Sequence, residues 1–397
     1  MVKELSRIAR GVRASTTMAI DSLFKQMKAE GQDVIGFAAG EPDFPTPDHI
    51  KEAAFQAIRE NFTRYTPASG TLELKQAACD RVKADFGVSY TPSQAVVASG
   101  AKHVVYLALR ALVDPGDEVI LPTPAWVSYY ELIRMVGGIP VVIHASESEQ
   151  FKLSPEKLEQ AITPRTKAVI FNNPSNPTGM LYDARQLRAL AEVCVRYDLY
   201  ILSDEIYSSL VYDGRDFTCM AALGEEVKRR TILINGVSKS YAMTGWRIGY
   251  GLAEPEIARV MSNYVSHSTG SPCAVSQKAA LTALTASQEQ IRSMREAFQA
   301  RRDYMVARIN AIPDVGCIRP EGAFYVMMNV EKQIGRTIGG FEIGSAEDFA
   351  TAFLKQGLVA VVPGEGFGAP GFVRWSYAAS MENIKEGLDR LERFLAQ

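Results

Sequence analysis

The 397-residue sequence lacks several features that would assign its class at once. It has no run of about 18 apolar residues, so no membrane-spanning helix is expected. Its first residues, MVKELSRIARGVRASTTMAI, mix charged and apolar positions, so we expect no signal peptide and no membrane partner. The formal net charge of −2 excludes a strong basic field, so we expect no nucleic-acid partner.

Cysteine and histidine are scarce and scattered. The five cysteines form no CxxC pair, which favours a reducing, cytoplasmic location over a disulfide framework. The four histidines lie far apart, and none has the near spacing of a zinc motif, so we expect no metal centre. What remains is an ordinary globular composition, 47% apolar and 22% charged, in a chain long enough for two domains.

Between residues 95 and 252 the chain alternates short apolar runs with amphipathic helical stretches. The seven strand-like runs are AVVASG, DEVILP, IPVVIHA, TKAVIFNNP, LYILSDE, TILINGVSK and WRIGYGLA. Such alternation predicts an α/β fold with a mainly parallel seven-stranded sheet covered by helices. After about residue 285 a long charged helix and the strands GAFYVMMNV and FVRWSYA predict a smaller α+β domain. We expect an N-terminal arm with part of the small domain at 1–45, a large domain at 46–285 and the small C-terminal domain at 286–397.

Polar residues follow several of these strands, at the edge where open α/β sheets bind ligands. The SGAK turn (99–102) ends a strand and begins a helix, so it is either an ordinary connection or a phosphate site. Trp126, in a Pro-rich loop, either fills a core or stacks on a flat ligand. Asn176, held before Pro177, serves either turn chemistry or hydrogen bonding to a ligand oxygen.

An aspartate and a lysine complete this pattern. Asp204 follows a buried strand, with Tyr207 three residues on, and is either a helix N-cap or the partner of a protonated ring nitrogen. NGVSKSYAMTGWRIGYG places Lys239 among small residues, which allow a bulky ligand to approach, and Arg247 before an apolar run. Jointly these features predict a pyridoxal phosphate pocket. Lys239 would bond the cofactor, Asp204 would hold its ring nitrogen, and the SGAK turn, Ser238 and Arg247 would bind its phosphate.

Motifs along essentially the whole chain carry a family resemblance. They are GEPDF (40–44), RYTPASG (64–70), NPSNPTG (173–179), SDEIY (203–207), SKSYAMTGWRIGYG (238–251), EGAFYVMM (321–328) and VRWSYA (373–378). As a set they resemble the class I, fold-type I aminotransferases, and in detail the prokaryotic aspartate aminotransferase branch. The resemblance implies pyridoxal 5′-phosphate as cofactor, amino acid and 2-oxo acid substrates, and a homodimer with shared active sites.

The resemblance also implies individual roles. Lys239 would move a proton at the substrate Cα, and Arg374 would bind the substrate α-carboxylate. The other implied cofactor contacts are stacking by Trp126, hydrogen bonds to the ring oxygen from Asn176 and Tyr207, and phosphate contacts from Gly100, Ala101, Lys102, Ser238 and Arg247, with Tyr65 reaching the phosphate of the partner subunit. The implied substrate contacts are Gly40, Trp126 and Asn176 around the amino acid, with Lys102 and Thr17 at its distal carboxylate.

These roles predict transfer of the amino group from L-aspartate to 2-oxoglutarate in two half-reactions. Prephenate, aromatic amino acids, alanine or kynurenine are alternative substrates, because one pocket residue can redirect the choice. A carbon–sulfur β-lyase is a second alternative, because such enzymes keep the same lysine and aspartate. A regulator that uses the fold as a ligand sensor would need a DNA-binding segment, and the sequence has no basic region for one.

Overall fold

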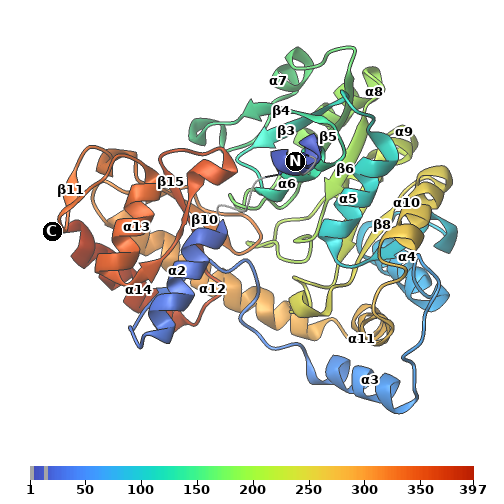
Figure 1. Cartoon of the computed structure of the whole chain (residues 1–397), viewed down its shortest axis with the longest axis horizontal. Helices are drawn as coiled ribbons and strands as arrows, with labels where there is room; N and C mark the ends of the chain where they lie inside the picture. Colours follow the sequence, from blue (N-terminus) through green and yellow to red (C-terminus); the bar gives the residue numbers. More distant parts are fainter. Residues whose placement is uncertain (1–3, 13–16) are drawn as a thin grey trace.

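The computed structural model describes residues 4–12 and 17–397. Its larger body, on the right in Figure 1, is built on a seven-stranded sheet. In spatial order the strands are β2 (Ala95–Ala98), β8 (Gly249–Leu252), β7 (Thr231–Gly236), β6 (Tyr200–Asp204), β5 (Thr166–Asn172), β3 (Glu118–Thr123) and β4 (Ile139–His144). Strands β7, β6, β5, β3 and β4 are parallel, whereas β8 pairs antiparallel with both β2 and β7. The predicted α/β class and mainly parallel sheet are confirmed.

Helices cover both faces of this sheet because its strands are apolar on both sides. One face packs against α5 (Ala101–Leu112), α6 (Ser128–Met135) and α10 (Pro255–Ser268). The other packs against α3 (Asp48–Arg59), α4 (Leu72–Phe86), α7 (Pro155–Gln160), α8 (Ala184–Arg196), α9 (Glu225–Arg230) and α11 (Ala274–Thr285). Helices cover the two faces but not the strand ends. The carboxyl ends of β5, β6 and β7 face the second body across a cavity.

The smaller body has an antiparallel sheet with its own core. Its strands run in the order β14 (Val362–Pro363), β15 (Phe372–Ser376), β10 (Tyr325–Asn329) and β9 (Gly316–Cys317). Four helices pack around it: α2 (Thr17–Ala29), α12 (Glu289–Ala311), α13 (Ala346–Gly357) and α14 (Met381–Leu395). The short remaining elements are α1 (Arg7–Gly11), the parallel pair β1 (Ile35–Gly36) and β13 (Val359–Ala360), and the hairpin β11 (Thr337–Ile338) and β12 (Phe341–Glu342).

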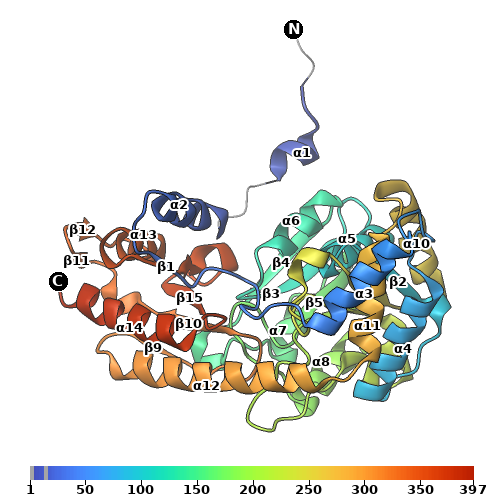
Figure 2. The same cartoon turned by 90° about the horizontal axis from the view of Figure 1, so that it is seen from below.

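Within residues 17–397, the chain passes between the two bodies twice. Residues 37–47 lead from β1 in the smaller body to α3 in the larger one, and residues 286–288 lead from α11 back to α12. Figure 2 shows α12 running along the base of the molecule beneath both bodies. We propose residues 46–285 as the large domain, with 1–45 and 286–397 forming the arm and the small domain. None of the helices in the described ranges has the length and apolar character needed to cross a membrane.

Candidate active site

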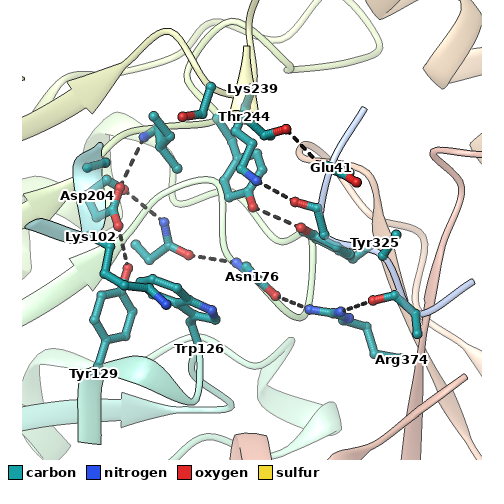
Figure 3. Close-up of a pocket in the computed structure, with 18 of the residues that line it drawn as sticks. Glu41, Lys102, Trp126, Tyr129, Asn176, Asp204, Lys239, Thr244, Tyr325 and Arg374 are labelled. Carbon is teal, nitrogen blue, oxygen red and sulfur yellow. Dashed lines mark hydrogen bonds between the residues drawn. The ribbon is translucent and has the colours of Figure 1, made fainter. Parts of the chain in front are cut away.

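A cavity of about 540 Å³ lies between the two bodies, at the carboxyl ends of the central strands (Figure 3). The sequence-predicted residues that line it are Gly40, Ala101, Lys102, Trp126, Asn176, Asp204, Tyr207, Ser238, Lys239, Arg247 and Arg374. These residues come from both bodies and from most of the chain length, so the cavity exists only in the folded protein. It is open to solvent and has room for a flat ring with a phosphate and a small amino acid.

Lys239 follows β7 and extends into the cavity. Its Nζ donates a hydrogen bond to the backbone oxygen of Gly40. Burial lowers the pKa of Lys239 to about 8, and the nearby charges of Arg374 and Arg247 act in the same direction, whereas Glu41 opposes them. At pH 7 about one-tenth of this amine is therefore uncharged, and the uncharged form is the one that acts as a nucleophile or a base.

Asp204 is the last residue of β6, and no helix begins there, which excludes the N-cap interpretation. Its Oδ2 accepts a 2.6 Å hydrogen bond from the hydroxyl of Tyr129, and its Oδ1 accepts one from the Ile206 N–H at 3.2 Å. Burial raises the pKa of Asp204 to about 6, against the opposing effect of these bonds and of Lys239. The carboxylate remains ionised at pH 7, so it can pair with a cation in the cavity.

The first turn of α5 forms one end of the cavity. The first N–H groups of an α-helix lack partners within the helix, so those of Ala101 and Lys102 suit an anion. Gly100 has φ +88°, and a Cβ on it would come within 2.3 Å of Arg247 Nη2. A Cβ on Gly249 in β8 would come within 2.2 Å of Ala101 N, so this glycine lets the helix end press against the sheet. The Arg247 guanidinium donates to the Thr244 and Ser99 carbonyls at 2.9 and 3.2 Å, which aims it at the same place.

Arg374 lies on β15 at the opposite side of the cavity. Its Nη1 donates to Asn176 Oδ1 at 2.8 Å, and its Nη2 donates to the Ala38 carbonyl at 2.9 Å. The guanidinium also lies over the rings of Tyr325 and Phe367, at 4.4 and 4.9 Å from their centroids. Its buried Nε has no hydrogen-bond partner within the described chain. The planar guanidinium of Arg374 keeps its charge and presents paired N–H groups, so it can bind a carboxylate.

Two aromatic residues shape the remaining walls. Trp126 packs edge-to-face on Tyr129, at 5.3 Å between centroids, and Lys102 Nζ lies 4.8 Å from the centroid of the Trp126 ring. Partial desolvation of the Lys102 amine and the charge of Arg247 both lower the pKa of Lys102. Tyr207 is buried, and its hydroxyl lies 2.9 Å from that of Tyr325. Burial raises the pKa of Tyr207 well above its ordinary value, so this hydroxyl keeps its proton.

Two predicted residues, Gly100 and Tyr65, are not among the residues that line the cavity. Gly100 lies directly behind it, as the N-cap of α5 in contact range of Arg247. Tyr65 is 98% exposed in the single chain, away from the cavity. Thr17 begins α2, but its side chain lies outside the described residues.

Nine of the residues that line the cavity had no predicted role, and among them are Tyr129, Tyr325, Glu41 and Thr244. Tyr129 and Tyr325 contact Asp204 and Tyr207 across 75 and 118 positions of sequence, which no local pattern reveals. Thr244 Oγ1 donates to Glu41 Oε2 at 2.7 Å, joining the loop after Lys239 to the segment that leads to α3. Glu41 and Tyr325 lie in the motifs GEPDF and EGAFY, which carry the family resemblance, but no individual role was predicted for either residue.

Comparison with known proteins agrees with this geometry. The sequence profile of the family described as aminotransferase class I and II matches residues 32–391. An aspartate aminotransferase of Bacillus subtilis is 44% identical over 392 residues, covering 99% of both proteins. An aspartate/prephenate aminotransferase of Cereibacter sphaeroides is 47% identical over 394 residues, covering 99% of this chain and 98% of the relative. The crystal structure of the aspartate aminotransferase from Rhizobium meliloti has a TM-score of 0.96 and 41% identity, and covers 100% of this chain and 99% of that one.

The chain belongs to the aminotransferase class I and II family. It is an enzyme of the pyridoxal phosphate-dependent type, and the site residues fit that cofactor. An amine suited to bond an aldehyde, a carboxylate for a ring nitrogen and a helix N-terminus with an arginine for a phosphate all face one cavity. Because glycine has no side chain, Gly100 leaves room for Arg247 at this end of the cavity, since a Cβ there would lie 2.3 Å from Arg247 Nη2.

Proposed function

We propose that this enzyme transfers the amino group of L-aspartate to 2-oxoglutarate, forming oxaloacetate and L-glutamate. The observation that carries this proposal is the placement of two cationic side chains around one amine. Arg374 and Lys102 line the same cavity as Lys239, and Figure 3 shows them on either side of Asn176. A dicarboxylic amino acid has one carboxylate for each cation, and its amine then lies near Lys239.

Each side chain has a defined part in this chemistry. Pyridoxal phosphate, when bound, supplies an aldehyde for amine exchange and a protonated ring that withdraws electrons from the substrate Cα. Asp204 keeps the ring nitrogen protonated, and Tyr207 and Asn176 hold the ring oxygen. The free amine of Lys239 would be the base that takes the proton from the substrate Cα and delivers it to the carbon on the other side of the substrate nitrogen. Trp126 covers the ring face, which limits access of water.

The phosphate and the α-carboxylate fix the ends of the reacting assembly. The N–H groups of Ala101 and Lys102, the hydroxyl of Ser238 and the guanidinium of Arg247 bind the phosphate. Arg374 holds the α-carboxylate bidentately, supported by Asn176. With both ends held, Cα stays within reach of the Lys239 amine, and this fixed geometry lowers the barrier to proton transfer.

A half-reaction scan tests the substrate assignment. The enzyme loaded with pyridoxal phosphate is mixed with single amino acids and no 2-oxo acid, and the loss of the cofactor absorbance is followed. Fast loss with aspartate and glutamate, with alanine and phenylalanine slow, supports the proposal. Fast loss with phenylalanine or with a prephenate-derived amino acid would move the enzyme to the second candidate, which the 47% identical aspartate/prephenate aminotransferase favours. Release of pyruvate and thiol from a cysteine conjugate would instead indicate a β-lyase.

We also propose that two copies assemble as a homodimer with shared active sites. Exposed side chains in residues 55–72 support this, because Tyr65 is 98% exposed, Phe55 54%, Ile58 52% and Leu72 66% in the single chain. Sedimentation at several protein concentrations measures the assembly, and a monomeric species that transfers amino groups would contradict it. A reducing cytoplasm remains our predicted location, since all five cysteines are free thiols.

A further inference from the structure

Tyr325 joins the two bodies of the molecule at the active site. It begins β10 in the smaller sheet and is fully buried. Its hydroxyl lies 2.9 Å from that of Tyr207, which follows β6 in the larger sheet. Figure 3 shows the labelled Tyr325 close to Lys239. The Tyr325 hydroxyl is also near Gly40, whose backbone oxygen accepts from Lys239, because a Cβ on Gly40 would lie 3.2 Å from it.

The ring of Tyr325 also supports the substrate-binding arginine. In the antiparallel pair of β10 and β15, Tyr325 lies opposite Ser376, and Met327 lies opposite Arg374. Tyr325 and Arg374 are therefore diagonal neighbours on one face of the sheet. The guanidinium carbon lies 4.4 Å from the ring centroid, the geometry of a cation–π contact. The positions of Arg374 and of the Tyr325 ring at the cavity are therefore directly linked.

The direction of the hydroxyl bond follows from counting protons. A tyrosine hydroxyl has one proton to donate and can also accept. If Tyr207 gave its proton to Tyr325, it would have none for the ring oxygen of the cofactor. If Tyr325 is the donor, the oxygen of Tyr207 is satisfied and its own proton points into the cavity.

We propose that Tyr325 is a positioning residue, which donates to Tyr207 so that Tyr207 donates to the cofactor, and which links this bond to Arg374. This inference rests on the proposed function. It adds a second connection between the substrate carboxylate and the ring oxygen of the cofactor, through Arg374, Tyr325 and Tyr207. The first connection runs through Asn176, which accepts from Arg374. Burial raises the pKa values of both Tyr207 and Tyr325, so both hydroxyls stay protonated over the working pH range.

The test uses the cofactor-loaded enzyme and three variants, Tyr325→Phe, Tyr207→Phe and the double variant. The readout is the midpoint of the pH-dependent absorbance change of the bound cofactor. Losing a donor to the ring oxygen concentrates negative charge on that oxygen. The Lys239 nitrogen, where it is bonded to the cofactor, would then become more basic, so the midpoint rises. We expect Tyr207→Phe to raise it by about one pH unit or more, and Tyr325→Phe by a smaller amount in the same direction. The double variant should match Tyr207→Phe alone, because Tyr325 acts through Tyr207.

Tyr377→Phe is the matched control. Tyr377 is fully buried just after β15, and its hydroxyl donates to the carbonyls of Gly322 and Ala323, both at 3.4 Å, outside the cavity lining. It tests the loss of a buried hydroxyl without the link to Tyr207, so its midpoint should stay at the wild-type value. A Tyr377→Phe shift as large as that of Tyr325→Phe would overturn the proposal.

Kinetics supply a second readout. Tyr325→Phe keeps the ring under Arg374, so kcat for aspartate should fall about tenfold with little change in KM, whereas Tyr325→Leu should also raise KM. An unchanged midpoint in Tyr325→Phe, or a shift that adds to that of Tyr207→Phe, would overturn the inference and leave the proposed function standing. A wild-type protein that binds no pyridoxal phosphate would overturn both.

Discussion

Replacing Asp204 by asparagine tests the electrostatics of the site without any substrate. In the cofactor-free protein this carboxylate is buried, and burial raises its pKa from 3.8 to about 6. The charged groups near it are Lys239, which acts to lower this pKa, and Glu205, whose own pKa burial raises to about 7. The hydroxyl of Tyr129 and the N–H of Ile206 stabilise the ionised form in part.

The sign and size of the effect follow from proton linkage. Between pH 3.8 and about 6 the native state binds more protons than the unfolded chain, so stability falls as the pH rises and stays lowered above that range. At about 1.4 kcal/mol for each pKa unit, the ionised carboxylate lowers the free energy of unfolding by about 3 kcal/mol at pH 8. An asparagine removes this penalty but loses one hydrogen bond, at about 1 kcal/mol. We therefore expect the cofactor-free Asp204→Asn protein to be about 2 kcal/mol more stable than wild type at pH 8, and less than about 1 kcal/mol more stable at pH 5.

The assay is urea unfolding of both cofactor-free proteins at pH 5 and pH 8, at one protein concentration. Glu205 titrates in both proteins, but the charge of Asp204 raises its pKa in wild type alone, so the difference between the two proteins reports Asp204 together with this coupling. Adding pyridoxal phosphate should stabilise wild type far more than the variant, because only wild type pairs a carboxylate with the ring nitrogen. Equal stability of the two cofactor-free proteins at both pH values would refute the burial argument.

Three other substitutions probe the remaining parts of the site. Lys239→Ala should retain its fold by circular dichroism but lose the absorbance of the lysine-bound cofactor and at least about a thousandfold in kcat, and normal turnover would show that another base acts. Gly100→Ala should weaken cofactor affinity more than about tenfold in an absorbance titration, since its Cβ would meet Arg247 at 2.3 Å, whereas Gly214→Ala, at φ +65° with open space around it, should not. Lys102→Ala should raise KM for aspartate about tenfold and leave KM for alanine unchanged, and equal losses for both substrates would remove Lys102 from the distal carboxylate.

Much of the fold could be predicted from the sequence because buried parallel strands and amphipathic helices have strong local patterns. The pattern in WRIGYGLA identified a strand, but its antiparallel direction depends on pairing with β2 and β7, which lie elsewhere in the chain. The residues with a required chemistry, such as Lys239 and Asp204, were found from motifs. Tyr129 and Tyr325 were not assigned, because their importance lies in hydrogen bonds to distant residues.

The two links between the bodies within residues 17–397 limit how one body can move relative to the other. A body attached by two short links can rotate about the line that joins them, but it has little freedom to slide or to turn about other axes. One of these links, residues 37–47, contains Gly40, which contacts Lys239, whereas Arg374 lies on the sheet that rotates. We therefore expect any opening of the cavity to follow a single angular coordinate, which changes the separation of Arg374 and Lys239 while the amine stays beside the pivot.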